Sequence, residues 1–471
     1  MTDTLMVGVS GVRGIVGKDL TPEVVTRWAR AFGTWAREGK GDEGRGKRTS
    51  VVVGRDARTS GPAFAAAVTA GLTSVGCDVI DVGLVPTPTV QLAVEHHHAG
   101  GGIAITASHN PIEWNALKFI GPDGIFLDGA EGKRVAELVA QDGGRGTRDE
   151  GRVAVDPDAV QRHLAAVLRL PGLDIDGIRK RKFAVALDAV RGAGGPPMRD
   201  LLEQLHCRVT GLNLETDGRF PRGPEPIPEN LGDLAALVRR SGADAGLAVD
   251  PDVDRLAIVD ETGAPIGEDY TLAFAVRAVL GKRDGGRGTS KPTVVCNLST
   301  SLVVEDAARE CGAEVVRTPV GEVHVARAIL RLAAVIGGEG NGGVMYPALH
   351  AGRDAPVAAA LLLALLARDG KRVSEVVAGA PRYVIVKGKA ERGRRNAEQG
   401  MEDVYAGLRR RFPDATVDTQ DGLRLAWRDR WLHVRPSNTE PIIRLIAEAP
   451  TGALARDLVD EGRRLCAASA S

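Results

Sequence analysis

Ser50-Val51-Val52-Val53-Gly54-Arg55-Asp56 is a short apolar run that ends in charged residues. Residues 62–76 follow with the pattern of an amphipathic helix, and residues 77–83 form a second apolar run. Apolar runs of four or five residues bounded by Gly and Asp are typical of buried strands. Their alternation with a helix indicates a βαβ unit. This stretch therefore predicts an α/β domain.

The same order of strand, helix and strand recurs twice along the chain. The second copy spans residues 182–210, with its helix near 196–205, and the third spans residues 293–317, with its helix near 301–311. Strands that alternate with helices in this way favour sheets built from βαβ units. Three copies more than a hundred residues apart predict three related α/β domains.

The character of the chain changes after Pro381. An alternating strand begins at Tyr383, a helix is expected over residues 395–411, and short strands surround the turns at 421–422 and 428–430. A last helix is expected near residues 452–467. This order predicts a smaller α+β domain at the C-terminus.

Length, charge and cysteine content limit the class of protein. The 471 residues suffice for about three domains at ~150 residues each, and four smaller ones also fit. Lys and Arg together number 61, and so do Asp and Glu. Proteins that bind nucleic acids or membrane surfaces usually carry a strong excess of basic residues, so we expect neither kind of partner. The N-terminus lacks the pattern of a secretory signal, which predicts a cytoplasmic protein. The five cysteines form no CxxC pair and are expected to be buried or free thiols.

A possible nucleophile lies in Thr106-Ala107-Ser108-His109-Asn110-Pro111, a polar turn after the strand-like residues 101–105. Serine is a poor nucleophile at its normal pKa, so a reactive serine needs a base, a metal ion or a strained turn. Alone, a Ser-His-Asn turn more often satisfies its own backbone. The complete hexapeptide favours a functional Ser108.

A second polar motif, Asp250-Pro251-Asp252-Val253-Asp254-Arg255, lies between two apolar runs. Its three carboxylates can surround one cation if the loop is tight, and Mg²⁺ favours a few carboxylates with further positions left for water or phosphate. An EF-hand calcium loop also begins DxDxD, but it needs Gly where Arg255 stands. A haloacid-dehalogenase-type phosphotransferase with an Asp nucleophile is an alternative, yet it leaves the Ser108 motif unexplained.

The two motifs together resemble the α-D-phosphohexomutase family, whose members shift phosphate between C1 and C6 of hexoses. The resemblance covers nearly the whole chain and implies an α/β fold: three related mixed-sheet domains and a smaller C-terminal α+β domain around a central cleft. It implies domain boundaries at residues 1–152, 153–260, 261–376 and 377–471. These domains would carry, in order, the phosphoserine loop, the metal loop, the sugar loop and the phosphate loop.

The resemblance implies roles for the first two loops, defined as residues 106–111 and 250–255. Ser108 would carry the phosphoryl group. A phosphate oxygen on Ser108 would join three aspartates around Mg²⁺: Asp250, Asp252 and Asp254. Three residues would assist the transfer, with Lys118 as a candidate acid, base or cation: Arg13, Lys118 and His109.

The remaining two loops would hold the substrate. Residues 338–343, the sugar loop, carry Glu339 and Asn341, where related loops commonly have Ser in place of Asn341 and sometimes His in place of Gly343. An expected strand over residues 333–336 precedes it. Residues 435–441, the phosphate loop, have the form RPSNTEP. The further substrate-binding residues implied are Arg255, Thr318, Gly321, Arg435, Ser437, Asn438, Thr439 and Arg444.

The implied activity is interconversion of hexose 6-phosphate and hexose 1-phosphate through a 1,6-bisphosphate, with Mg²⁺ as cofactor and hexose 1,6-bisphosphate as activator. The form of the sugar loop is similar to the archaeal-type phosphoglucosamine mutase branch, which favours glucosamine phosphate over mannose or glucose phosphate. The expected partners are small sugar phosphates, for a monomer or a homodimer. A sugar phosphatase and a non-catalytic sugar-phosphate sensor are the competing functions.

Overall fold

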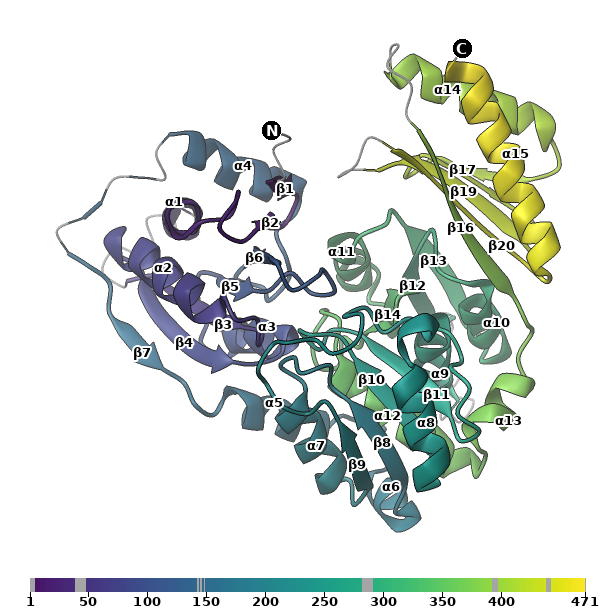
Figure 1. Ribbon diagram of the computed structural model, residues 1–471, viewed down its shortest axis with the longest axis horizontal. Helices are drawn as coiled ribbons and strands as arrows, with labels where there is room; N and C mark the ends of the chain where they lie inside the picture. The colour runs from purple at the N-terminus through teal and green to yellow at the C-terminus, as the bar shows by residue number, and fades with distance from the viewer. Residues whose placement is uncertain are drawn as a thin grey trace.

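A computed structural model describes residues 5–38, 48–141, 144, 146–147, 149–281, 291–391, 397–437 and 442–470. The chain forms four sheets that follow one another around an arc, from the N-terminal sheet to the C-terminal one (Figure 1). No helix in these described ranges has the length and apolar character needed to cross a membrane. The five cysteines are free thiols, and all except Cys311 are buried.

The first sheet has seven strands in the order β1-β2-β6-β5-β3-β4-β7. Its strands are β1 Met6–Gly8, β2 Gly11–Ile15, β3 Ser50–Arg55, β4 Asp78–Leu84, β5 Gly102–Ile105, β6 Trp114–Ile120 and β7 Val153–Val155. Its helices are α1 Pro22–Glu38, α2 Gly61–Ser74, α3 Thr87–His96 and α4 Gly129–Ala140. Because β7 pairs with β4, this sheet extends three residues beyond the domain boundary expected at residue 152.

The second sheet has the order β11-β10-β8-β9. Its strands are β8 Ala184–Asp188, β9 Arg208–Leu212, β10 Ala245–Val249 and β11 Leu256–Asp260. The helices of this part are α5 Ala159–Val167, α6 Ile175–Arg181, α7 Gly195–Gln204 and α8 Gly232–Ser241, with a short 3₁₀ helix at Pro228–Asn230. The antiparallel pair β10 and β11 places the metal loop in the turn between them.

The third sheet has the order β13-β12-β14-β15. Its strands are β12 Thr293–Asn297, β13 Glu314–Thr318, β14 Ile336–Glu339 and β15 Gly343–Met345. Its helices are α9 Asp269–Leu280, α10 Leu302–Glu310, α11 Glu322–Leu332, α12 Ala355–Asp369 and α13 Val373–Ala378. The three predicted βαβ units are confirmed, because β3 and β4, β8 and β9, and β12 and β13 each pair in parallel.

Helix α12 joins the second and third sheets into one hydrophobic core. Its residues from Ala355 to Leu366 are all buried, and they belong to a cluster that also includes Leu187 of β8 and Val294 of β12. A helix that is apolar on every side is stable only when it is buried on every side. The metal loop and the sugar loop therefore rest on a shared core.

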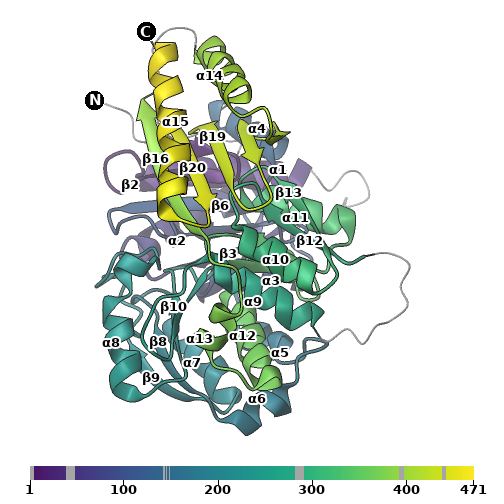
Figure 2. The ribbon, with the colours of Figure 1, turned by 90° about the vertical axis from the view of Figure 1, so that its right-hand side faces the viewer.

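The C-terminal sheet has the order β16-β20-β19-β18-β17 and is antiparallel throughout. Its strands are β16 Val384–Glu391, β17 Thr416–Asp418, β18 Leu423–Ala426, β19 Trp431–Pro436 and β20 Ile442–Ala449. Helices α14 Ala397–Arg411 and α15 Gly452–Ala470 cover one face (Figure 2). Strand β20 was not predicted from the sequence, although its first six residues alternate between partly exposed and buried positions.

Candidate active site

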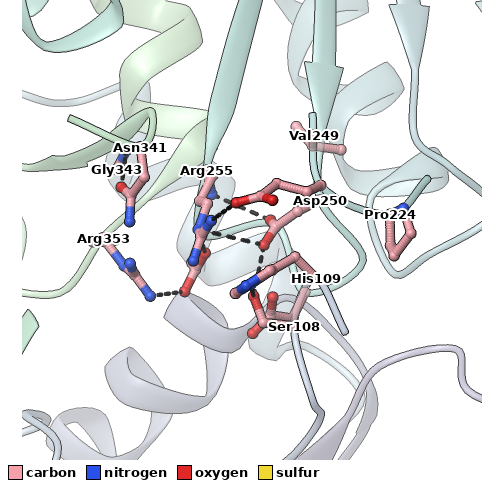
Figure 3. Close-up of polar contacts among 12 residues, drawn as sticks. Ser108, His109, Pro224, Val249, Asp250, Arg255, Asn341, Gly343 and Arg353 are labelled. Carbon is pink, nitrogen blue, oxygen red and sulfur yellow. Dashed lines mark hydrogen bonds and ion pairs between the residues drawn. The ribbon is translucent and has the colours of Figure 1, made fainter. Parts of the chain in front are cut away.

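Ser108 is buried in the loop between β5 and β6, where it faces the second sheet. Its Oγ donates a hydrogen bond to Asp250 Oδ2 at 2.8 Å, and its backbone N donates to Thr106 Oγ1 at 2.9 Å. Its φ of 48° lies in the left-handed region, which costs a non-glycine residue about 1–3 kcal/mol. The surrounding contacts hold the serine in this conformation, with its hydroxyl directed at the metal loop (Figure 3).

Arg58, which the sequence analysis missed, supplies most of those contacts. Its guanidinium is fully buried and pairs with Asp56 at 3.1 Å. It donates four hydrogen bonds of 2.7–2.8 Å to the carbonyl oxygens of Ser108, Asn110, Pro111 and Trp114. One side chain thus fixes the path of the phosphoserine loop. A lone arginine after Asp56 carries no motif of its own, so only the fold reveals this role.

The metal loop gathers three buried carboxylates at the turn between β10 and β11. One oxygen from each of Asp250, Asp252 and Asp254 lies within 4.8 Å of the others. Val253 between them has a φ of 64°, an uncommon conformation for a β-branched residue. This strained turn directs its neighbouring aspartates to one point.

The three aspartates fit a divalent cation. Asp252 Oδ1 and Asp254 Oδ1 are buried and have no hydrogen-bond partner within the described part of the chain. Burial, followed by the charges of Asp254 and Asp252, raises the pKa of Asp250 well above its usual value. Buried carboxylate oxygens without a hydrogen-bond partner are costly, and oxygen ligands of this kind suit Mg²⁺. The donor set therefore matches the metal that the sequence predicts.

Lys118, on β6, lies against the same carboxylates. Its Nζ is 2.6 Å from Asp252 Oδ2 and 3.7 Å from Asp254 Oδ2. Burial by itself lowers the pKa of Lys118, but Asp252 and Asp254 outweigh it and raise that pKa above the usual value. Lys118 is therefore held as an ammonium ion. This geometry favours the cation among its expected roles.

Arg13 and His109 lie beside Ser108. Arg13 Nη1 donates to Asn110 Oδ1 at 2.7 Å, and His109 Nδ1 is 3.4 Å from Ser108 Oγ. Burial, with the nearby charges of Arg255 and Arg13, lowers the pKa of His109 to about 2. A neutral imidazole with so low a pKa is a weak base, so its position favours hydrogen bonding over proton abstraction.

Arg255, the last residue of the metal loop, lies among carboxylates. Its Nε lies 3.7 Å from Asp254 Oδ1 and 4.0 Å from Asp250 Oδ2, and its Nη1 lies 3.3 Å from Glu225 Oε1. The guanidinium is therefore held by carboxylates at the edge of the same cluster.

The sugar loop begins inside a strand. The strand expected over residues 333–336 is instead β14, Ile336–Glu339, because α11 continues to Leu332 and Ala333 ends it in the left-handed conformation. Glu339 Oε1 accepts hydrogen bonds from Asn297 Nδ2 at 2.8 Å and from Gly321 N at 3.3 Å.

Two further residues expected at the sugar site lie around these contacts. Thr318 ends β13, is buried, and donates its hydroxyl proton to Pro319 O at 3.0 Å. Asn341 Oδ1 accepts a hydrogen bond from Gly343 N at 3.1 Å and so closes the turn. The structure thus gathers Thr318, Gly321, Glu339 and Asn341 at one end of the third sheet.

The phosphate loop follows β19. Arg435 on β19 and Arg444 on β20 are cross-strand partners, and Ser437 N donates to Ile442 O at 2.9 Å. Burial lowers the pKa of Arg435 below its usual value, although the charges of Asp421 and Glu339 act in the opposite direction. The charge of Glu339, in the sugar loop, therefore acts on Arg435. Asn438 and Thr439 lie outside the described residues.

A hydrogen bond that the sequence analysis missed joins the phosphate-loop strand to the third sheet. Ser299 Oγ lies 2.8 Å from His433 Nδ1, and His433 Nε2 lies 2.7 Å from the carbonyl oxygen of Asp421. Since a carbonyl only accepts, Nε2 carries the proton and Ser299 donates to Nδ1. This pairing depends on a contact across 134 residues, which no local pattern encodes.

Comparison with known families agrees with this arrangement. Three alpha/beta/alpha domain models and one C-terminal domain model of phosphoglucomutase/phosphomannomutase match residues 4–145, 161–263, 267–383 and 385–465. The chain belongs to this family. It is a phosphohexomutase-type α/β protein, as the sequence predicted, and the haloacid-dehalogenase alternative is excluded.

Relatives within the family cover nearly the whole chain. A phosphoglucomutase/phosphomannomutase of Thermococcus kodakarensis is 39% identical over 462 residues, which cover 97% of each chain. A probable phosphoglucosamine mutase of Methanopyrus kandleri is also 39% identical, over 456 residues and 96% of each chain. Among solved structures, a family protein of Burkholderia thailandensis superposes with a TM-score of 0.83 at 27% identity, covering 98% of this chain and 96% of that one.

Proposed function

We propose that this phosphohexomutase uses Ser108 as the phosphoryl carrier between the two ends of a hexose phosphate. The observation that carries the proposal is the 2.8 Å hydrogen bond from Ser108 Oγ to Asp250. It brings a buried hydroxyl of the first sheet to the acidic loop of the second. A carrier must lie where charge on a transferring group can be stabilised.

The proposed reaction has two balanced transfers. In the first, the bond from phosphorus to Ser108 Oγ breaks while a sugar hydroxyl oxygen bonds to phosphorus, and the proton of that hydroxyl ends on Ser108. The resulting bisphosphate turns end over end. In the second, Ser108 Oγ takes the other phosphoryl group and its proton returns to the sugar oxygen. A hexose 1,6-bisphosphate can therefore prime an unphosphorylated enzyme as activator.

The side chains around Ser108 would have different roles in the transfer. Asp250, Asp252 and Asp254 would hold Mg²⁺, which when bound supplies positive charge to the transferring phosphoryl oxygens. Lys118 and Arg13 would add fixed positive charge beside the same oxygens, and His109 would orient them by hydrogen bonding. Phosphoryl transfer depends mainly on such positioning and charge.

The fourth sheet would hold the phosphate that is not transferred. Arg435 and Arg444 face the same side of adjacent strands, which suits two-point binding of a phosphate dianion. Ser437, Asn438 and Thr439 would complete this site with hydroxyl and amide groups. One binding site for either end of the bisphosphate allows both orientations to be productive.

For the sugar, we favour glucosamine phosphate, with mannose and glucose phosphates as the alternative. Support comes from the form of the sugar loop at residues 338–343, which is similar to the archaeal-type phosphoglucosamine mutase branch. Two relatives that are each 39% identical to this chain have different names: one is a phosphoglucomutase/phosphomannomutase, and the other is a probable phosphoglucosamine mutase. The sugar must therefore be assigned by assay.

Coupled assays with glucosamine, glucose and mannose 6-phosphates, run side by side with the matched bisphosphate, test this proposal. We expect the largest kcat/KM for glucosamine phosphate and no turnover by Ser108→Ala. Faster turnover of another sugar overturns the preferred substrate. Release of inorganic phosphate without isomerisation indicates a phosphatase, and binding without turnover indicates a sensor.

A further inference from the structure

Arg353, in the segment between β15 and α12, is buried among three carboxylates that come from different parts of the fold. Its Nη2 lies 2.6 Å from Asp254 Oδ2 and 3.0 Å from Glu322 Oε2, and its Nη1 lies 2.9 Å from Glu339 Oε2. Figure 3 shows this side chain between the turn at Asn341 and Gly343 and the metal loop. Arg353 is thus a direct bridge from the metal loop to the sugar loop.

Two main-chain hydrogen bonds lie close to these loops in the sequence. Ala355 N donates to Val253 O at 3.3 Å, and Leu256 N donates to Gly342 O at 3.0 Å. Gly342 has a φ of 86°, and a Cβ there would lie 2.5 Å from Leu256 O, so only glycine fits this approach. The sugar loop is therefore joined by its main chain to the strand that follows the metal loop, and the metal loop is joined to the start of α12.

Arg353 also fills the space beside Gly343. A Cβ on Gly343 would lie 2.2 Å from Arg353 Cδ, far closer than two carbon atoms can approach. A side chain at position 343 and the observed conformation of Arg353 therefore exclude each other. The glycine at this position, where some related sugar loops have histidine, therefore leaves the space that Arg353 occupies.

Arg353 contacts one oxygen of Asp254 and one oxygen of Glu339. Arg353 binds Asp254 through Oδ2, while Oδ1 accepts no hydrogen bond in the described ranges and lies 3.7 Å from Arg255 Nε. It binds Glu339 through Oε2, while Asn297 binds Oε1. A planar guanidinium can hold two carboxylates at once in fixed directions, which a lysine ammonium on a flexible stem cannot.

We propose that Arg353 is a positioning residue that aligns Asp254 for the cation and Glu339 for the sugar, so that metal binding and sugar binding depend on the same side chain. This inference rests on the proposed assignment of the two loops. Partners that orient a metal ligand typically change metal affinity by about 10–100-fold when they are altered.

The decisive variant is Arg353→Lys, because it keeps the positive charge and removes the two-way contact. Mn²⁺ binding to the full-length protein, followed by electron paramagnetic resonance and expressed per folded molecule, reports on Asp254 without any turnover. We expect Mn²⁺ affinity to fall about tenfold or more, together with a rise in KM for the sugar phosphate. Unchanged affinity and unchanged KM would overturn the proposal.

Gly343→Ala is the second variant, since it leaves Arg353 in the chain but displaces it. We expect the same direction of change in Mn²⁺ affinity and in KM; wild-type values in this variant would also overturn the proposal. Arg277→Lys is the matched control. Arg277, on α9, pairs with Glu310 at 2.8 Å, and neither residue belongs to the metal loop or the sugar loop. This control should bind Mn²⁺ like the wild type.

Mn²⁺ binding by the wild-type protein distinguishes a failure of the proposed metal loop from a failure of the proposed role of Arg353. If it binds no Mn²⁺, the proposed metal loop itself is wrong. If it binds Mn²⁺ and Arg353→Lys binds it equally well with an unchanged KM, the metal loop stands and only the role of Arg353 fails.

Discussion

Lys118 Nζ, on the first sheet, lies 2.6 Å from Asp252 Oδ2, on the second sheet. Thr87 Oγ1 donates to the same carboxylate oxygen at 2.9 Å. Lys118 of β6 and Thr87 of α3 thus both contact Asp252, and Ser108 contacts Asp250. The serine and the acidic loop are therefore aligned by contacts that do not involve the sugar.

Replacing Lys118 tests its role as a cation in the transfer. We expect Lys118→Gln to lower kcat about 10²-fold or more, because one fixed positive charge beside the transferring group is lost. Steady-state kinetics with saturating bisphosphate give this value. Lys133→Gln, on the exposed face of α4, is the control and should keep wild-type kcat. A kcat within threefold of wild type in Lys118→Gln would contradict the role.

Replacing Arg58 tests what holds the phosphoserine loop. Arg58→Lys keeps the charge but cannot supply all the donors that four buried carbonyl groups now use. Because each unpaired buried group costs about 1–3 kcal/mol, we expect a loss of about 3 kcal/mol in the free energy of unfolding. Denaturant titration measures it. The neighbouring Arg55→Lys should change stability by only about 0.5 kcal/mol or less, and an equal loss in both variants would refute this account.

Removing the Ser299 hydroxyl tests the link between the third sheet and the phosphate loop. His433 lies two residues before Arg435, and burial lowers the pKa of His433 to about 4, so the ring is neutral near pH 7. We expect Ser299→Ala to raise KM for the sugar phosphate about fivefold, corresponding to one lost hydrogen bond of about 1 kcal/mol. The value of kcat should change less than KM. A selective loss of kcat would point to a role in chemistry instead.

The carboxyl of Asp269 predicts a pH dependence of stability. Burial, followed by the nearby Glu448, raises the pKa of Asp269 to about 8. In the unfolded chain an aspartate loses its proton near pH 4. Between about pH 4 and pH 8 the folded protein therefore binds more protons than the unfolded chain, and the stability contributed by this group falls as pH rises through that window.

Asp269→Asn should remove that slope, because the amide stays neutral and its oxygen can still accept the hydrogen bond that Ser301 N donates at 2.8 Å. Melting temperatures measured from pH 5 to pH 9 should depend less on pH in the variant than in the wild type. The increase in melting temperature over the wild type should be largest near pH 8 and above. Asp457→Asn, at an exposed position on α15, should follow the wild-type profile. Parallel profiles for wild type and Asp269→Asn would disprove the assignment.

The local patterns of the sequence predicted the three βαβ units and the loops that carry Ser108 and the aspartates. Those features depend on short runs such as residues 50–56 and on motifs of six residues, which are readable without the fold. The turn at Val253 was not predicted, because its left-handed conformation is imposed by packing against the core. Strand β20 was missed because Arg444 was interpreted only as part of the phosphate loop.

The residues that connect the loops could not be predicted from sequence. Arg58, Arg353 and Ser299 act through partners that lie tens to more than a hundred residues away. An isolated arginine or serine has no pattern that distinguishes it from a surface residue. Their roles follow from burial and from the carbonyl or carboxylate groups that the fold brings to them.

The central claim is that Ser108 carries the phosphoryl group. A single-turnover experiment tests it: enzyme phosphorylated at Ser108 with labelled phosphate is mixed with excess unlabelled glucosamine 6-phosphate, and the label is followed by rapid quench. We predict that the label leaves Ser108, appears in the sugar bisphosphate and then in glucosamine 1-phosphate or glucosamine 6-phosphate. Isomerisation while the label stays on Ser108, or passage of the label directly to inorganic phosphate, would contradict the account.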